Sequence, residues 1–153
     1  MEPHPTTLAR IQKITGTQPT SWYHIDRGYT VAERWVLQLK NGTSVFVKVA
    51  TNENTIGWLR DEVRVYQSIR GDFLPKFIGW DDGEFPLLVL EDLSAATWSW
   101  KWSQEYIQRV LTTLDKVANT HVPQSFPELS QMSAQLTGWQ EVAKNPSGFL
   151  GLS

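Results

Sequence analysis

The sequence predicts an α+β fold: a five-stranded, mainly antiparallel sheet with one packed helix, followed by two or three α-helices. Three patterns support this prediction. Short apolar runs with a period of two recur before residue 92 and are separated by Gly, Asn and Asp. One run with a helical period, over 52–70, interrupts them. After residue 103 the helical period takes over and continues to about residue 144.

The first half of the chain holds the predicted strands. Asn41-Gly42 lies between the second and third strands and indicates a hairpin, for which we expect a tight primed turn. Asn52 or Asn54 would cap the helix that follows, because their side chains accept hydrogen bonds from free N–H groups. In order, the predicted elements are a helix over 6–14, strands over 21–25, 32–39 and 45–50, a helix over 52–70, and strands over 75–80 and 85–90.

Two helices are predicted in the last third of the chain. Ser103 caps the first of them, which extends to about residue 121. Ser125 and Glu128 match a capping box, so we expect the second helix to begin there and to end near residue 144. The apolar stripe of this second helix comprises Leu129, Met132, Leu136 and Trp139.

Length and composition limit which binding partners and which cellular compartment we expect for the chain. The 153 residues suit one domain or one lobe, and the change of character at residue 94 divides them into 1–93 and 94–153. Net charge is −2 with scattered basic residues, which disfavours nucleic acid. No apolar run reaches the length of a membrane span, and there is no cysteine, so a cytoplasmic protein without a membrane partner is expected. The histidines, His4, His24 and His121, lack the close pairing of common zinc sites, so no metal site is expected.

Lys48 is the residue that points to a function. Side chains alternate along a strand, so the valines of 45–50 share one face while Phe46, Lys48 and Ala50 share the other. An ammonium among apolar neighbours needs a partner or a ligand. Glu62, on the predicted helix, would supply the partner, and a nucleotide phosphate the ligand. The alternative is a strand lysine whose head reaches water.

Other residues would complete a nucleotide site. Phe46 would stack on a purine, although packing under the helix is the more frequent role of a lone Phe. The turn with Gly28 and Thr30 would cover the phosphates, or it is an ordinary hairpin turn. Main-chain groups of Glu91 and Leu93 would pair with the base, or the acidic segment is a solvated turn.

The chain resembles the aminoglycoside phosphotransferase and choline kinase-like family, which has a protein-kinase-like fold. The resemblance is clearest at 45–50 and 87–94, with a weaker similarity at 117–123. It implies that Lys48 holds the α- and β-phosphates of ATP and that Glu62 is its ion-pair partner. It also implies that Phe46 packs against adenine and that the main chain of Glu91 and Leu93 binds the base. The turn of Gly28 and Thr30 would cover the phosphates.

The resemblance stops before the catalytic residues. The family has a His-Gly-Asp loop and then Mg²⁺ ligands, whereas His121 is followed by Val-Pro and no Asp follows Asp115. We therefore expect an ATP-binding lobe of a small-molecule phosphotransferase, a fragment or truncated product that is inactive alone, with Mg²⁺ only in a full-length member. The alternative is a non-catalytic module that binds nucleotide or mediates dimerisation, with homo-oligomers formed through the exposed C-terminal helix face.

Overall fold

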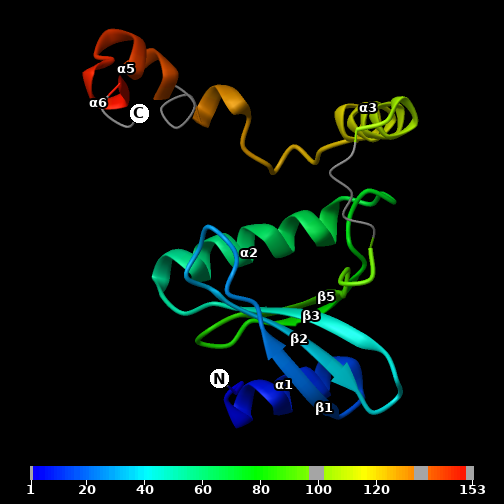
Figure 1. Cartoon of the computed structure of the whole chain (residues 1–153). Coiled ribbons are helices and arrows are strands. Elements are labelled where there is room, and N and C mark those ends of the chain that lie inside the picture. Colours follow the sequence, from blue (N-terminus) through cyan, green and yellow to red (C-terminus); the bar gives the residue numbers. More distant parts are fainter. Residues whose placement is uncertain (1, 97–101, 133–137, 151–153) are drawn as a thin grey trace. The chain divides into compact units, whose positions relative to one another are not determined.

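The protein has an α+β fold, in which the five strands of the described residues form one antiparallel sheet (Figure 1). The structure is a computed structural model that describes residues 2–96, 102–132 and 138–150. The chain divides into two compact units, residues 1–120 and residues 121–153, and each is described by itself. The sheet belongs to the first unit. The boundary that the sequence suggested after residue 93 stays a prediction.

Each predicted strand is present, and its ends differ from the prediction by at most two residues. The order across the sheet is β1-β2-β3-β5-β4. The third strand therefore lies in the middle of the sheet and pairs with both β2 and β5. The bounds are β1 Pro19–His24, β2 Glu33–Leu39, β3 Ser44–Val49, β4 Phe77–Asp81 and β5 Leu87–Glu91.

The connection between β2 and β3 is a hairpin, as predicted, but the prediction of a primed turn is wrong. The type I′ turn typical of Asn-Gly needs positive φ at both central residues. Here Gly42, with φ of 84°, has positive φ and Asn41 does not. Gly42 N–H donates to Leu39 O (2.9 Å), and the Asn41 side chain accepts from Thr43 N–H (3.1 Å). The asparagine side chain thus stabilises a turn that needs left-handed backbone only at the glycine.

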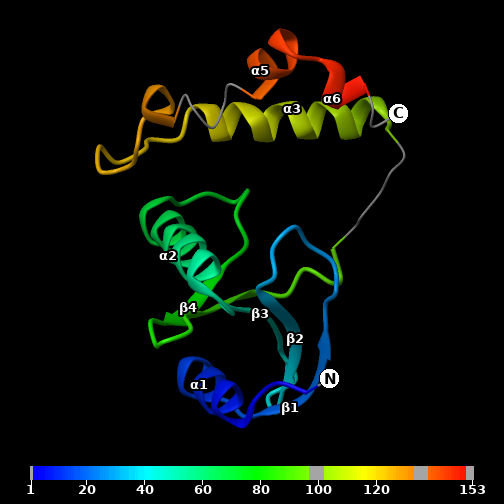
Figure 2. The ribbon, with the colours of Figure 1, turned by 90° about the vertical axis from the view of Figure 1, so that its left-hand side faces the viewer.

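Two helices cover opposite faces of the sheet (Figures 1 and 2). The first is α1 (Pro5–Thr15) and the second is α2 (Glu53–Ser68). Because side chains alternate along β3, its valines pack on the α1 side, while Phe46 packs on the α2 side. The α1 side buries Ile11, Trp35, Leu37, Leu39, Val45, Val47, Val49, Leu87 and Val89, and the α2 side buries Ala50, Leu59, Val63, Tyr66, Leu88 and Leu90.

The starts of two helices follow the capping signals in the sequence. Asn52, not Asn54, caps α2: its Oδ1 accepts from Thr55 N–H (2.9 Å) while Thr55 Oγ1 accepts from Asn52 N–H (3.0 Å). Ser103 caps α3 (Gln104–Ala118). Both caps satisfy N–H groups that have no partner inside the helix.

The prediction of one α-helix from Ser125 to about residue 144 is wrong at its beginning. Residues Leu129–Met132 form a short 3-10 helix, η1. Gln131 closes this turn, since its N–H donates to Glu128 O (2.9 Å) and its side chain accepts from Glu128 N–H (3.0 Å). These contacts span three residues and favour 3-10 geometry over α-helix. Residues 133–137 lie outside the described part, and α5 (Gly138–Lys144) and α6 (Ser147–Leu150) follow.

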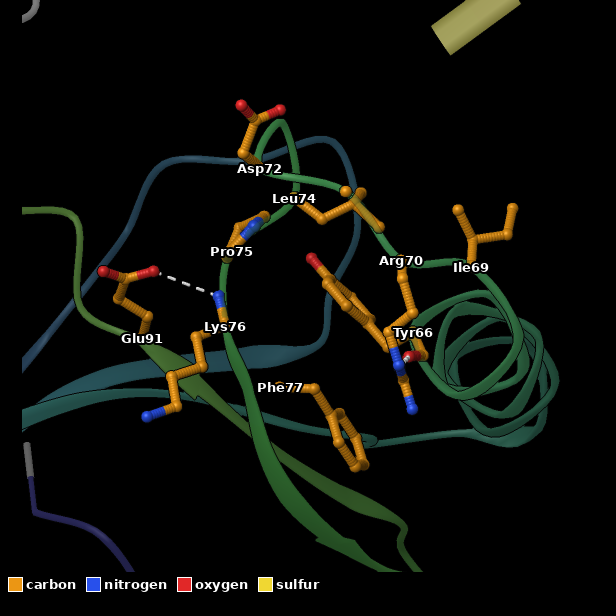
Figure 3. Close-up of a pocket in the computed structure, with 10 residues that line it drawn as sticks. Tyr66, Ile69, Arg70, Asp72, Leu74, Pro75, Lys76, Phe77 and Glu91 are labelled. Atoms are coloured by element: carbon orange, nitrogen blue, oxygen red, sulfur yellow. Dashed lines mark hydrogen bonds between the residues drawn. The ribbon is translucent and has the colours of Figure 1, made fainter. Parts of the chain in front are cut away.

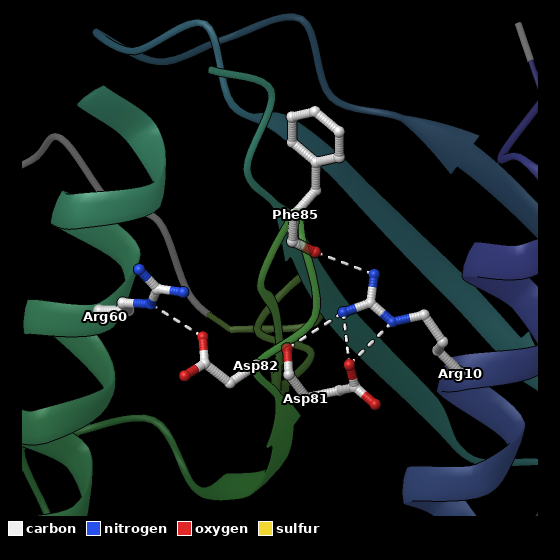
Figure 4. Close-up of polar contacts among 5 residues, drawn as sticks. All are labelled: Arg10, Arg60, Asp81, Asp82 and Phe85. Atoms are coloured by element: carbon white, nitrogen blue, oxygen red, sulfur yellow. Dashed lines mark hydrogen bonds and ion pairs between the residues drawn. The ribbon is translucent and has the colours of Figure 1, made fainter. Parts of the chain in front are cut away.

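Two arginines hold the hairpin between β4 and β5 from opposite sides (Figure 4). Arg10 of α1 donates to Asp81 Oδ1 (2.6 and 3.0 Å), to Asp81 O (3.0 Å) and to Phe85 O (2.9 Å). Arg60 of α2 donates to Asp82 Oδ1 (2.8 Å). The Arg10 pair is less exposed, with side chains 23% and 28% accessible against 48% and 46% for the Arg60 pair.

We predict that Arg10→Met lowers the free energy of unfolding by about 2 kcal/mol, because it leaves partly buried acceptors without donors. Arg60→Met is the matched control and should cost less than about 1 kcal/mol, as expected for an exposed pair. Urea unfolding of both variants measures the difference. Equal losses of unfolding free energy in the two variants would show that the burial of the Arg10 contacts has no energetic consequence.

Candidate functional site

Lys48 and Glu62 form an ion pair between β3 and α2. Lys48 Nζ lies 2.6 Å from Glu62 Oε1, and the two side chains are 25% and 30% exposed. Lys48 faces α2 because the valines on either side of it face α1. The carboxylate compensates a charge that would be costly among apolar neighbours. The pairing suggested by the sequence is therefore present, and its role in holding a ligand stays a prediction.

A pocket of about 410 Å³ opens beside Lys48. The structure brings four predicted site residues together in its lining: Phe46, Lys48, Glu91 and Leu93. Glu62 is not among the lining residues but contacts one of them, Lys48. The volume lies in the range of about 300–1,000 Å³ that is typical of small-molecule sites. The remaining lining residues are Ile25, Val36, Tyr66, Pro75, Leu90, Asp92 and Ser94.

Sequence reasoning assigned none of these remaining residues to the site, although signals exist for two of them, Val36 and Tyr66. Val36 pairs directly with Phe46 across β2 and β3, so following the strand register from the hairpin would have found it. Tyr66 lies one helical turn after Glu62. Burial raises the pKa of Tyr66, and the nearby Glu62 carboxylate raises it further. Tyr66 therefore presents a neutral phenol to the pocket at neutral pH.

Figure 3 shows the residues of a second cavity, of about 500 Å³, which shares Tyr66, Pro75 and Glu91 with the first. The rings of Tyr66 and Phe77 stack with centroids 6.2 Å apart. The Glu91 carboxylate accepts from Lys76 N–H (3.0 Å), which fixes the side chain on the segment that enters β4. These contacts place Tyr66 and Glu91 at the border between the two cavities.

The main chain of the predicted base-binding segment makes contacts within the chain. Glu91 N–H donates to Lys76 O (2.9 Å), and Leu93 O accepts from Ala96 N–H (2.9 Å). The Glu91 N–H and the Leu93 carbonyl are thus already engaged. The pairing of a nucleotide base with the main chain of these residues stays a prediction.

Gly28 and Thr30 are not brought into the pocket lining. Their turn folds instead around the guanidinium of Arg34, a residue that the sequence did not single out. Arg34 donates to Thr30 O (3.1 Å), to the Thr30 hydroxyl and to Ala32 O (2.9 Å). The Thr30 hydroxyl is therefore an acceptor for arginine in this structure, and its role as a phosphate donor stays a prediction.

A polar network centred on Asp92 holds the segment that follows β5. Asp92 accepts from the hydroxyls of Ser44 (2.7 Å) and Ser94 (2.5 Å) and from Ser94 N–H (2.9 Å). The Tyr23 hydroxyl lies 2.8 Å from Ser94 Oγ and donates to it, since the Ser94 proton is directed at Asp92. Burial opposes ionisation of Asp92, but the hydrogen bonds from Ser44 and Ser94 outweigh it and hold the pKa of Asp92 below its usual value.

No protein-family model, curated protein or solved structure matches this chain. The resemblance to the aminoglycoside phosphotransferase and choline kinase-like family therefore stays a prediction. In the part of the chain that the structure describes, none of the helices has the length and apolar character that a membrane span requires.

We predict that Asp92→Asn lowers the free energy of unfolding at pH 7 by about 1 kcal/mol, because an amide accepts hydrogen bonds less strongly than a carboxylate. The folded-state pKa of Asp92 is depressed. Its stabilisation is therefore complete above the unfolded pKa of about 3.9 and is lost as pH falls through the folded pKa.

Urea unfolding between pH 7 and pH 3 measures this effect, and the difference between parent and variant should shrink toward the acid end. Asp61→Asn is the control, because that carboxylate pairs with Arg64 on the exposed surface of α2. A difference that stays constant across this pH range would contradict the account of Asp92.

Proposed function

We propose that the first unit binds a nucleotide such as ATP in the pocket beside Lys48. The observation that carries this proposal is the placement of one ammonium at an otherwise largely apolar pocket, with Glu62 holding it at 2.6 Å. A carboxylate at this distance orients the ammonium and supports its charge. The ammonium keeps further donors for a phosphate, since Glu62 takes one of three.

The lining suits the two ends of a nucleotide. Val36, Phe46 and Leu90 pair across three adjacent strands and give an apolar surface for the base. Phe46 would supply an aromatic face, and base–aromatic stacking contributes about 1–3 kcal/mol per base. Lys48 is the next residue of β3 on the same face, so the phosphates of a bound nucleotide would extend toward it.

We further propose that this unit is the ATP-binding lobe of a small-molecule phosphotransferase. The support is the order of its parts: a lysine strand, a helix carrying Glu62, and an apolar strand that leaves through Glu91 to Leu93. Phosphoryl transfer requires a positioned acceptor and metal-borne charge stabilisation. We assign neither of these roles to a described residue.

We predict that Mg-ATP raises the Tm of the full chain by several degrees. At an ATP concentration about 100-fold above Kd, binding adds about 2.7 kcal/mol to the stability of the folded state. Lys48→Met should lose most of this shift while keeping the fold, because the pocket retains its apolar surface. Lys40→Met is the control, since Lys40 is exposed in the turn after β2, and it should keep the whole shift. A parent protein that ATP does not stabilise would sink the proposal.

A second candidate function is self-association, and one observation favours it. The helix α3 leaves apolar side chains accessible along one face, with Ile107 37%, Leu111 49%, Leu114 57% and Val117 49% exposed. Such a stripe suits pairing with a second copy of the same helix. Of the stripe predicted in the later helix, Leu136 lies outside the described residues, and Trp139 is 72% exposed.

We predict that sedimentation of the parent depends on protein concentration if α3 mediates pairing. Leu114→Glu should then give a monomer at every concentration, because a carboxylate at the centre of the stripe would have to be desolvated. Thr113→Glu adds the same charge at the neighbouring position and should leave the association intact. A parent that is monomeric at the highest concentration contradicts this candidate.

A further inference from the structure

Two cations stand side by side on the α2 face of the sheet. Arg34 of β2 is the direct register partner of Lys48 of β3. Directly opposed residues of an antiparallel pair extend to the same face, with Cβ atoms about 4.5–5.5 Å apart. The next pair on this face is Val36 with Phe46, and both of these residues line the pocket. The apolar pair of Val36 and Phe46, here the apolar row, therefore lies next to the cationic pair of Arg34 and Lys48, here the cationic row.

The cationic row carries more positive than negative charge. Lys48 has a carboxylate partner, Glu62. Within the described part of the chain, no carboxylate forms an ion pair with Arg34, whose hydrogen bonds go to Thr30 and Ala32. Carbonyl and hydroxyl oxygens orient a guanidinium but do not neutralise it. Like charges directly opposite each other are destabilising, so an anion bound between them would relieve a repulsion.

The remaining donors of Arg34 suit such an anion. Thr30 takes one N–H from each terminal nitrogen, and Ala32 O takes the second N–H of Nη1. Among the described residues this leaves Nε–H and one N–H of Nη2, which lie along the same edge of the guanidinium. That edge forms the fork that binds phosphate or carboxylate in a bidentate manner.

The backbone of the turn lies very close to the guanidinium of Arg34 at Gly28. Gly28 has φ of 143°, and a Cβ atom at this position would lie 2.6 Å from Arg34 Cζ. Only glycine allows the backbone both this conformation and this contact. The hydroxyl of Thr51 also bonds to this turn, since it donates to Val31 O (2.9 Å). The position of Arg34 is thus fixed by the turn.

We propose that Arg34 is a second phosphate-binding residue, which together with Lys48 holds the polyphosphate of the nucleotide. The proposal rests on the nucleotide-binding function proposed above and adds a residue to it. The base lies on the apolar row of Val36 and Phe46, and the phosphates lie over Arg34 and Lys48. The turn of Gly28 and Thr30 then acts through Arg34, as the support of its guanidinium.

Calorimetric titration of the full chain with ATP, adenosine and inorganic tripolyphosphate tests this proposal. Arg34→Gln should weaken the binding of ATP and tripolyphosphate by at least about tenfold, because the loss of even one of the two charge-assisted hydrogen bonds of the fork has an effect of that size. Adenosine, which carries no phosphate, should bind unchanged. Arg34→Lys keeps the charge but not the fork and should recover part of the loss. Arg109→Gln is the matched control: it removes the same charge from the exposed surface of α3, where the guanidinium pairs with Glu105, and it should keep all three affinities within about twofold.

The outcomes separate this proposal from the proposed function. Unchanged affinity of Arg34→Gln for ATP and tripolyphosphate would overturn the role of Arg34. An equal loss of affinity for adenosine would also overturn the role of Arg34, because such a loss would show a structural effect on the whole pocket. A parent that binds tripolyphosphate through Arg34, but neither ATP nor adenosine, would uphold the phosphate site and refute nucleotide binding. A parent that does not bind tripolyphosphate would overturn the phosphate site.

Discussion

The position of Lys48 is the constraint on which the rest of the site depends. The valines of β3 are needed under α1, so alternation leaves Lys48 on the other face, where α2 packs. There it requires a carboxylate, and Glu62 supplies one at 2.6 Å. An ion pair at this depth is weak evidence for stability, because desolvation offsets much of the attraction. Its consequence is geometric: it holds an ammonium at the edge of the pocket and links α2 to β3.

The register between β2 and β3 extends this constraint into an ordered surface. It places Val36 opposite Phe46 and Arg34 opposite Lys48, so apolar and cationic pairs follow each other along one face. A ligand with a flat apolar end and an anionic end matches this sequence of pairs. The network of Asp92 holds the segment after β5 along the pocket and adds polar groups at its rim. The candidate site is therefore formed by the sheet and by the short segment that follows β5.

Local periodicity was sufficient to predict much of this arrangement. The face of Lys48 follows from alternation, the start of α2 from Asn52, and the approach of Glu62 from the helical period. Arg34 and the Asp92 network could not be found in this way, because they depend on register and on contacts between distant segments. The wrong helix start after Ser125 has a local cause: the backbone and side chain of Gln131 both bond to Glu128 and form a 3-10 turn instead.

The central claim is that the nucleotide lies on the α2 face of β2 and β3, and amide chemical shifts on titration with Mg-ATP test it most directly. The account predicts that the largest shifts occur at Phe46, Lys48 and Leu93 and in the turn of Gly28. The amides of α1, on the opposite face of the sheet, should stay nearly unchanged. Shifts centred on α1 or on the C-terminal unit, or no shifts at millimolar ATP, would contradict the account.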